Sequence, residues 1–271
     1  MIVAILTFAQ AGGQDAAEKF ANATSSGIAL GAIYALLALG LVLIYKATQV
    51  LNFAHGALAA LGAFFAAYLA TVINFPGRYV TFVPTPVQWV LSALGAVILT
   101  AIVGLVVERL AIRPMIGEPL FSVVMITIAL DIVLRTITDD LIGSTPRPLG
   151  DPWGADVVNI GPALVAKTEI ATLVVTVITL VGIALFFRSR YGIAMRATAF
   201  DQEAAMAQGI SAGRIFAMAW AIGAGLAAVA GIFSSVYPRA ALGVSGTTAF
   251  FAFRALPAIV IGGLDSITGA V

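Results

Sequence analysis

The chain has 271 residues, of which 61% are hydrophobic and 10% charged, with a net charge of +1 and a mean hydropathy of +1.06. A soluble domain is about a quarter charged, so this composition excludes an ordinary soluble protein. The small net charge gives no basis for a nucleic-acid partner. The chain has no cysteine and a single histidine, which excludes disulfides and thiolate metal sites, and we expect no metal site.

The apolar residues occur in blocks of about twenty, the length at which a helix crosses a bilayer. Backbone amides in lipid must be paired internally, so the blocks are predicted to be helices. We therefore predict an all-α fold, a polytopic transmembrane helical bundle with six clear spans and a seventh, broken segment. The six spans cover residues 25–45, 52–73, 87–107, 120–137, 170–187 and 215–236. The seventh segment, 247–271, is interrupted by Arg254, Pro257, Gly262, Gly263, Asp265 and Gly269.

The N-terminal residues 1–24 lack the positively charged start of a signal peptide and are predicted to be an extramembrane leader. Residues 25–271 then form the transmembrane domain. With the N-terminus placed outside, the inside loops carry Lys46, Arg109, Arg113, Arg188, Arg190, Arg196 and Arg214. The outside loops carry Lys19, Arg78, Arg147, Lys167 and Arg239. Seven basic residues against five favour the N-terminus outside, because basic loops stay in the cytoplasm.

Small residues recur at four-residue spacing along three of the predicted spans, and they predict close packing between helices in lipid. A sliding surface between helices is the alternative interpretation. The positions are Gly27, Gly31 and Ala35; Ala59, Ala63 and Ala67; and Gly223, Ala227 and Gly231.

The segment 188–212 joins the fifth and sixth spans and lies in the cytoplasm under this orientation. Nothing from Ile193 to Gln208 breaks a helix, so we predict one short helix there, with Gly209 ending it and Ser211 capping the next. Its apolar stripe consists of Ala197, Phe200, Ala204 and Ala207. Helices that rest on lipid have large apolar residues and a strongly basic face, so this small stripe, flanked by Arg196 and Glu203, favours docking to a protein.

The stretch Glu203-Ala204-Ala205-Met206-Ala207-Gln208-Gly209 resembles the EAA-x-x-x-G coupling loop of bacterial ABC importer permeases. In that family the loop is a short helix that sits in a groove of the cytoplasmic ATPase. The resemblance therefore implies that Arg196, Phe200, Glu203, Ala204, Ala205 and Gly209 belong to the surface that contacts the ATPase. The Ile and Leu-Pro that follow in the family motif are absent here.

Two further stretches narrow the resemblance. Residues 38–64, which include Asn52-Phe53-Ala54-His55-Gly56, resemble the first signature of branched-chain amino acid permeases of the LivH type. Residues 254–271, with Gly262-Gly263 and Ser266-Ile267-Thr268-Gly269-Ala270, are similar to the late signature of the same permeases. Such permeases continue with one more span, so the chain is expected to be C-terminally incomplete or unusually short.

The resemblance implies a multi-pass subunit of the bacterial plasma (inner) membrane that performs no bond chemistry and holds no cofactor. ATP and Mg²⁺ would be used by two cytoplasmic ABC ATPase subunits. The further partners implied are a LivM-like permease or a second copy of this chain, and an extracytoplasmic solute-binding protein. Branched-chain amino acids are the implied substrate, and urea or short amides remain an alternative.

Other classes remain open at this point. A secondary transporter or channel usually carries an ionisable group at mid-membrane, and no uninterrupted span has one near its centre. Gly243-Val244-Ser245-Gly246 and Ala54-His55 echo rhomboid proteases, but His55 precedes Ser245, the reverse of the rhomboid order. Residues 161–168 nearly spell a P-loop, in which Ala166 replaces the required glycine.

Three groups of polar residues are candidates for the pathway or its gate. Asp131 and Arg135 share a helix face, as a local ion pair or as an outer gate. Asn52 and His55 open the second span, as caps or as pathway residues. Arg254 is costly in lipid and must face protein or water. With Pro257, Gly262 and Gly263 it predicts a discontinuous helix at the pathway.

Overall fold

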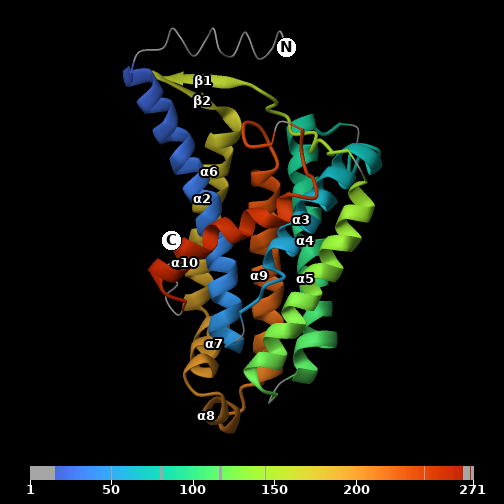
Figure 1. Ribbon diagram of the computed structural model, residues 1–271, viewed down its shortest axis with the longest axis vertical. Helices are drawn as coiled ribbons and strands as arrows, with labels where there is room; N and C mark the ends of the chain where they lie inside the picture. Colours follow the sequence, from blue (N-terminus) through green and yellow to red (C-terminus); the bar gives the residue numbers. More distant parts are fainter. Residues whose placement is uncertain are drawn as a thin grey trace.

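The computed structural model describes residues 16–49, 51–79, 82–115, 118–143, 145–240, 242–264 and 269. Within this part of the chain, six helices are long and apolar enough to cross a membrane. They lie roughly side by side in one bundle (Figure 1). The predicted all-α bundle of six spans is therefore confirmed.

The spanning helices each overlap one predicted span. They are α2 (Ala16–Thr48), α3 (His55–Ala67) continued by the π-helical η1 (Tyr68–Ile73), α4 (Thr85–Val107), α5 (Leu120–Ile142), α6 (Lys167–Arg188) and α9 (Ala212–Ser234). The other elements are η2 (Glu108–Ile112), η3 (Arg113–Met115), β1 (Val157–Ile160), β2 (Ala163–Ala166), α7 (Arg190–Phe200), α8 (Gln202–Ala207), η4 (Thr248–Ala255) and α10 (Leu256–Gly262).

Helix α2 is longer than its predicted span. Its 33 residues extend for about 50 Å at the usual rise per residue, which exceeds a hydrocarbon core of about 30 Å. Its N-terminal end is tied to the loop before α6, where the backbone N–H of Leu164 donates to the side-chain oxygen of Asn22 at 2.6 Å. Helix α2 runs without a break through residues 24 and 25, and residues 1–15 of the predicted leader lie outside the described residues.

The long connection between α5 and α6 contains a two-stranded hairpin, which the sequence did not predict. Strands β1 and β2 pair antiparallel, with Val157 opposite Ala166 and Ile160 opposite Ala163. Gly161 supplies the turn with a φ of +60°. The stretch that resembles a P-loop therefore forms a hairpin strand and the start of α6.

Helix α9 is the centre of the bundle and packs against α2, α3 and α4. Glycines allow this close approach: a Cβ at Gly231 would collide with the carbonyl oxygen of Ala59, and one at Gly223 would lie 3.0 Å from the carbonyl oxygen of Gly40. The predicted packing role of the α9 stripe is confirmed. Gly27 and Gly31 on α2 have nothing within 4 Å of an added Cβ among the described residues, so these two glycines make no such close contact there.

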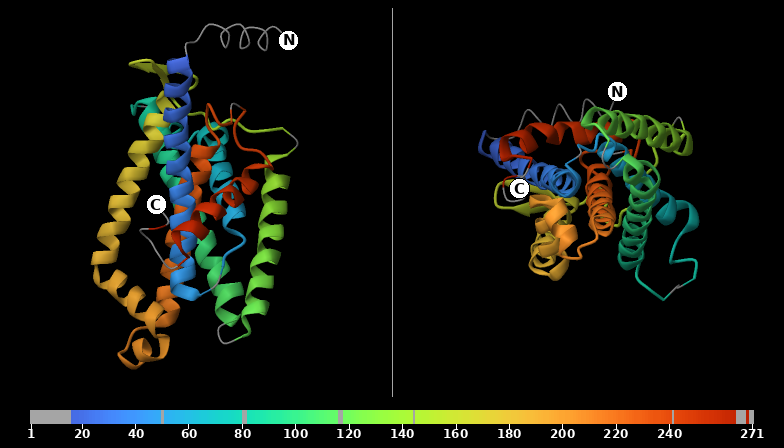
Figure 2. Two further views of the ribbon diagram at one scale, coloured as in Figure 1. Left: turned by 60° about the vertical axis from the view of Figure 1, so that its left-hand side comes forward. Right: turned by 90° about the horizontal axis from the view of Figure 1, so that it is seen from below.

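The two ends of the bundle differ in what they carry. Helices α7 and α8 project from one end, and the β1–β2 hairpin covers α2 and α6 at the other (Figures 1 and 2). At the hairpin end, Arg147 and Val244 exchange backbone hydrogen bonds of 2.9 and 2.8 Å. This bridge ties the connection after α5 to the connection after α9, which leads into η4.

Candidate translocation pathway and coupling surface

Elements η4 and α10 form one crossing segment, residues 248–262, that runs across α2 and α3 instead of along them (Figure 1). A 3-10 helix changes there to an α-helix whose first turn contains Pro257, a residue that suits a helix start because it has no N–H to satisfy. Gly263 follows with a φ of +90°. Residues 265–268, 270 and 271 of the late signature lie outside the described residues.

Asn52 and His55 lie at the start of α3, 0% and 2% exposed, facing the crossing segment. The Asn52 side-chain oxygen accepts a hydrogen bond of 3.0 Å from the backbone of Ala54, which stabilises the turn into α3. The His55 ring packs against Gly40, where a Cβ would lie 2.8 Å from Cε1. Both residues line, with Leu256, a cavity of about 10 Å³, close to the smallest that holds one water.

Asp131 and Arg135 form an ion pair on α5, between the Arg135 Nη2 and Asp131 Oδ2 atoms. The Arg135 guanidinium also lies over the ring of Phe250 in η4, with Cζ 4.2 Å from the ring centroid. The ion pair is therefore more than a local contact, because it joins α5 to the crossing segment. Sequence reasoning missed Phe250, since no spacing rule connects positions so far apart in the chain.

The predicted single helix over 193–208 is wrong. Asp201 has extended backbone angles, φ −151° and ψ 107°, and its side chain accepts a hydrogen bond from the Ala204 N–H at 2.9 Å. Aspartate is a preferred N-cap, so it ends α7 and starts α8. The proposed stripe of Ala197, Phe200, Ala204 and Ala207 does not form one helix face.

Gly209 ends α8, as predicted. Its φ is +83°, its N–H donates to the Met206 carbonyl at 2.9 Å, and the Ile210 N–H donates to the Ala205 carbonyl at 3.1 Å. These two bonds define a Schellman motif, in which glycine is favoured because the left-handed conformation crowds a Cβ. Ser211 occupies the N-cap position of α9, as predicted, but its side chain makes no capping hydrogen bond among the described residues.

The segment 190–209, which we call the coupling segment, leaves apolar side chains uncovered. Phe200 is 95% exposed and Met206 47%, and Glu203, Ala204 and Gly209 are also exposed. Ala205, another predicted contact residue, instead faces the protein and is 5% exposed. Arg196 is exposed, but its guanidinium donates to the Phe187 carbonyl at 2.6 Å, which fastens α7 to the end of α6.

An ion pair at the same end of the bundle joins two elements that the sequence did not connect. Arg113 donates to both carboxylate oxygens of Glu108 at 3.0 Å each, and its Nη2 also donates to the carbonyl of Gly213 in α9 at 3.0 Å. Residues five apart do not face each other on an α-helix. They do so here because η2 is a π-helix, whose hydrogen bonds span five residues.

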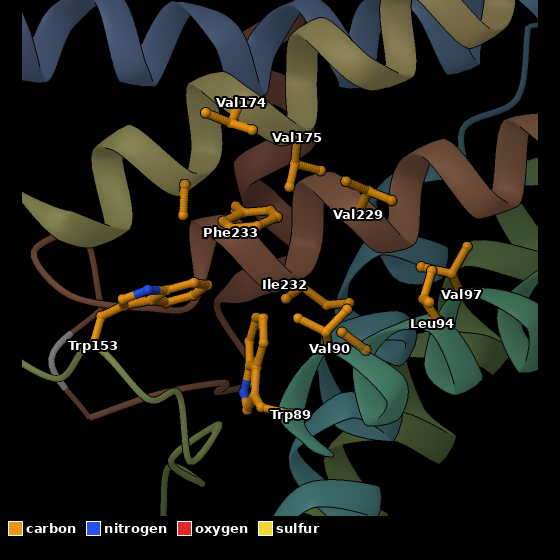
Figure 3. Close-up of a pocket in the computed structure, with 12 residues that line it drawn as sticks. Trp89, Val90, Leu94, Val97, Trp153, Val174, Val175, Val229, Ile232 and Phe233 are labelled. Atoms are coloured by element: carbon orange, nitrogen blue, oxygen red, sulfur yellow. The ribbon is translucent and has the colours of Figure 1, made fainter. Parts of the chain in front are cut away.

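A pocket of about 260 Å³ opens between α4, α6 and α9 (Figure 3). Trp89 and Trp153 close one end with ring centroids 5.1 Å apart, and Val174, Val229 and Phe233 form walls. Every lining side chain is apolar apart from the two indole N–H groups, and that of Trp89 is used by the Leu149 carbonyl at 3.0 Å. This apolar lining suits the acyl chains of lipids. It excludes the pocket as a binding site for a polar solute.

The serine-protease hypothesis finds no support in the geometry. The Ser245 hydroxyl lies 3.0 Å from the Thr247 hydroxyl, and His55 is buried against Gly40. No hydrogen bond joins Ser245 to His55 in the part of the chain that the structure describes. The nucleophile and base that acyl transfer requires are therefore not paired.

Comparison with known proteins supplies the family. The family model described as branched-chain amino acid transport system / permease component matches residues 23–271. The high-affinity branched-chain amino acid transport system permease protein BraD of Pseudomonas aeruginosa is 30% identical over 91% of this chain and 80% of its own length. LivH of Escherichia coli K12 is 28% identical over the same shares, and a probable LivH of Methanocaldococcus jannaschii is 29% identical over 87% of this chain and 72% of its own.

No solved structure matches the chain. The family match covers nearly the whole chain, and the six spanning helices agree with it. The chain therefore belongs to the branched-chain amino acid permease family of ABC importers, as a multi-pass transport subunit of the plasma membrane that is not itself an enzyme.

Proposed function

We propose that this permease imports branched-chain amino acids, the substrates named for its relatives BraD and LivH. Importers of this family work with ATPase and solute-binding subunits. For this chain we propose two cytoplasmic ABC ATPases, a soluble extracytoplasmic binding protein, and either a homologous LivM-like permease or a second copy as the other membrane half. The chain itself contributes the path and needs no cofactor, and ATP and Mg²⁺ belong to the partner ATPases.

The observation that carries this proposal is the coupling segment. It projects beyond the spanning helices (Figure 2) and leaves Phe200 and Met206 uncovered. Exposed apolar side chains that form a patch mark interaction sites. From Phe200 to Gly209, the exposed residues other than Phe200 and Met206 are small, polar or charged. This composition suits a shallow protein groove better than lipid, because lipid-bound helices carry a broad apolar face.

The same proposal places the coupling segment in the cytoplasm and the hairpin outside. The excess of lysine and arginine in loops at the end that carries α7 and α8, described above, supports this orientation. Two contacts then offer a route for movement. Arg196 holds the end of α6, and Arg113 joins α9 to the segment that follows α4.

The pathway is proposed to run along the crossing segment, past Asn52, His55, Arg254, Pro257, Gly262 and Gly263, with Asp131 and Arg135 at its gate. A short, interrupted helix lying among spanning helices is an arrangement that transporters use to bind polar solutes. The contact between Arg135 and Phe250 supports the gate, because movement of the crossing segment would disturb the ion pair with Asp131.

Reconstitution of the complete importer in liposomes tests the function. ATP-dependent uptake of L-leucine, with no uptake of urea, is the expected result, and uptake of urea alone would support the short-amide alternative. No uptake of either solute by a complex that hydrolyses ATP contradicts the proposal.

The docking surface is tested by Phe200→Ala. Because Phe200 is 95% exposed, its truncation should leave thermal stability within about 0.5 kcal/mol yet reduce co-purification of the ATPase. The matched control is Phe82→Ala, which removes a ring that is 87% exposed at the opposite end. Equal ATPase recovery from both variants contradicts docking at Phe200.

A further inference from the structure

A polar cavity of about 390 Å³ lies between the last turn of α9, the connection that follows it, and η4. We call it the arginine pocket. Its polar lining consists of Ser234, Arg239, Ser245, Thr247, Thr248 and Arg254. It differs from the apolar pocket of Figure 3 in having two guanidinium groups and four hydroxyls, with no carboxylate among its lining residues.

Arg239 is the residue that requires explanation. Its Nη1 and Nη2 atoms are buried and have no hydrogen-bond partner in the described part of the chain. Burial lowers the pKa of Arg239, and the negative charge of Glu169 acts in the opposite direction; the guanidinium nevertheless stays charged because its intrinsic pKa is so high. Buried charged donors without a partner cost free energy, so an acceptor at this position is expected.

Glu169, whose Oε1 atom is also buried without a hydrogen-bond partner among the described residues, does not supply that acceptor. One of its carboxylate oxygens accepts from the backbone N–H of Ala166 at 3.2 Å and caps α6. No ion pair within 4.0 Å joins Glu169 to Arg239, although the structure describes both residues. Arg239 lines the cavity and its two terminal nitrogens have no acceptor among the described residues, so a ligand that reaches them would supply one.

Arg254 adds a second charge to the lining of the cavity. Its Cζ lies 5.7 Å from the centroid of the Phe251 ring, a cation–π contact, and its N–H groups have no protein acceptor among the described residues. Two guanidiniums together attract an anion, and their paired N–H groups match a carboxylate in geometry. The rings of Phe250 and Phe251 also line the cavity and offer an apolar surface beside the charged one.

We propose that Arg239 and Arg254 bind the carboxylate of the transported solute, with its apolar side chain against Phe250 and Phe251. The cavity volume falls in the range of small-molecule sites. This inference rests on the proposed function and deepens it. It restricts the solute to a small apolar acid or amino acid and excludes urea, which has no carboxylate.

The site would also be linked to the gate, because Phe250 contacts the arginine pocket on one side and Arg135 on the other. A solute seated against Phe250 would thus touch the crossing segment at the residue that holds the ion pair of α5. Binding of the solute in the arginine pocket and the position of the gate ion pair are therefore coupled through the side chain of Phe250.

The test measures L-leucine transport by the complete importer in liposomes. Arg239→Gln and Arg254→Gln should each reduce the transport rate by at least about tenfold, the size expected for hydrogen bonds to a charged group. Arg239→Lys should recover part of the rate, because it restores the charge without the paired donors. ATP hydrolysis by each reconstituted complex is measured in parallel, so that a loss of transport can be compared with the amount of assembled importer.

Arg78→Gln is the matched control, since Arg78 is exposed in a loop at the same end of the bundle and lies outside the arginine pocket. Wild-type rates in both glutamine variants overturn the proposal. Failure of the wild-type importer to transport L-leucine would instead overturn the proposed function. Should Arg239→Gln not assemble, Arg239→Lys and Arg254→Gln decide the question in the same assay.

The headgroup of an anionic lipid would also attract two guanidinium groups, and the bilayer composition distinguishes this lipid from the solute. The assay is repeated in liposomes of phosphatidylcholine alone and in liposomes that also contain phosphatidylglycerol. Equal losses in both support solute binding. A loss confined to the phosphatidylglycerol liposomes shows that the arginines hold a lipid headgroup and overturns the proposal.

Discussion

Arg113 holds the carboxylate of Glu108 by two hydrogen bonds of 3.0 Å, with the glutamate side chain only 1% exposed. The same guanidinium reaches the Gly213 carbonyl at 3.0 Å. Gly213 lies in the first turn of α9, just after the coupling segment. One side chain therefore connects the end of α4, a buried negative charge and the helix at the centre of the bundle.

Arg113→Ala should destabilise the permease by about 3–5 kcal/mol, because it leaves the buried Glu108 carboxylate unpaired. Arg113→Lys should recover only part of this loss, since lysine cannot form both bonds in the same geometry. Thermal unfolding of the purified permease in detergent measures both. Lys167→Ala is the control: the Lys167–Asp156 pair is 44% and 62% exposed and should contribute at most about 1 kcal/mol. Equal shifts in the two alanine variants would contradict a structural role for Arg113.

Gly209→Val should abolish uptake and weaken ATPase association, because a β-branched residue resists the φ of +83° that ends α8. No atom lies within 4 Å of a Cβ at this position, so backbone conformation alone causes the effect. Gly209→Asn should therefore retain most of the activity, since asparagine tolerates the left-handed region. Co-purification of the ATPase and L-leucine uptake are measured together. If the valine and asparagine variants show the same uptake and the same ATPase recovery, the left-handed turn at Gly209 is not required for coupling.

Gly231→Ala should lower stability by about 1–3 kcal/mol, the usual cost of overpacking, because its Cβ would collide with the carbonyl of Ala59 on α3. Gly27→Ala should instead raise the stability of the permease. Its Cβ meets nothing within 4 Å, and alanine favours a helix interior over glycine by up to about 1 kcal/mol. Thermal unfolding of both variants in the same detergent provides the comparison, and a stabilising Gly231→Ala would show that α3 and α9 are not in close contact.

The orientation is tested with single cysteines, since the natural chain has none. Asn159 on β1 and Gln208 after α8 are both exposed and lie at opposite ends of the bundle. Asn159→Cys should react with a membrane-impermeant maleimide in intact cells, and Gln208→Cys only after permeabilisation, because the coupling segment is proposed to face the cytoplasm. The reverse pattern would place that segment outside and remove the ATPase-docking hypothesis with it.

Much of the architecture follows from the sequence by itself. Blocks of about twenty apolar residues have to be helices in lipid, because no water is present to pair their backbone amides. The prediction of Gly209 and Ser211 as helix boundaries also succeeded, since capping depends on residues next to one another in the chain. The same local reasoning predicted one helix over 193–208 and was wrong, because it did not weigh Asp201 as an N-cap against the surrounding helix-forming residues.

Only the tertiary structure decided which distant residues meet. Phe250 lies under Arg135, Gly213 accepts from Arg113, and Arg239 shares a cavity with Arg254. None of these pairs has a spacing that a helix period would bring together. Each depends on how the crossing segment and α9 pack against the other helices, and that packing is set by the close approach of small residues such as Gly231 and Ala59. Hydropathy identifies the spans, but their side-by-side order and rotation arise from contacts between side chains far apart in sequence.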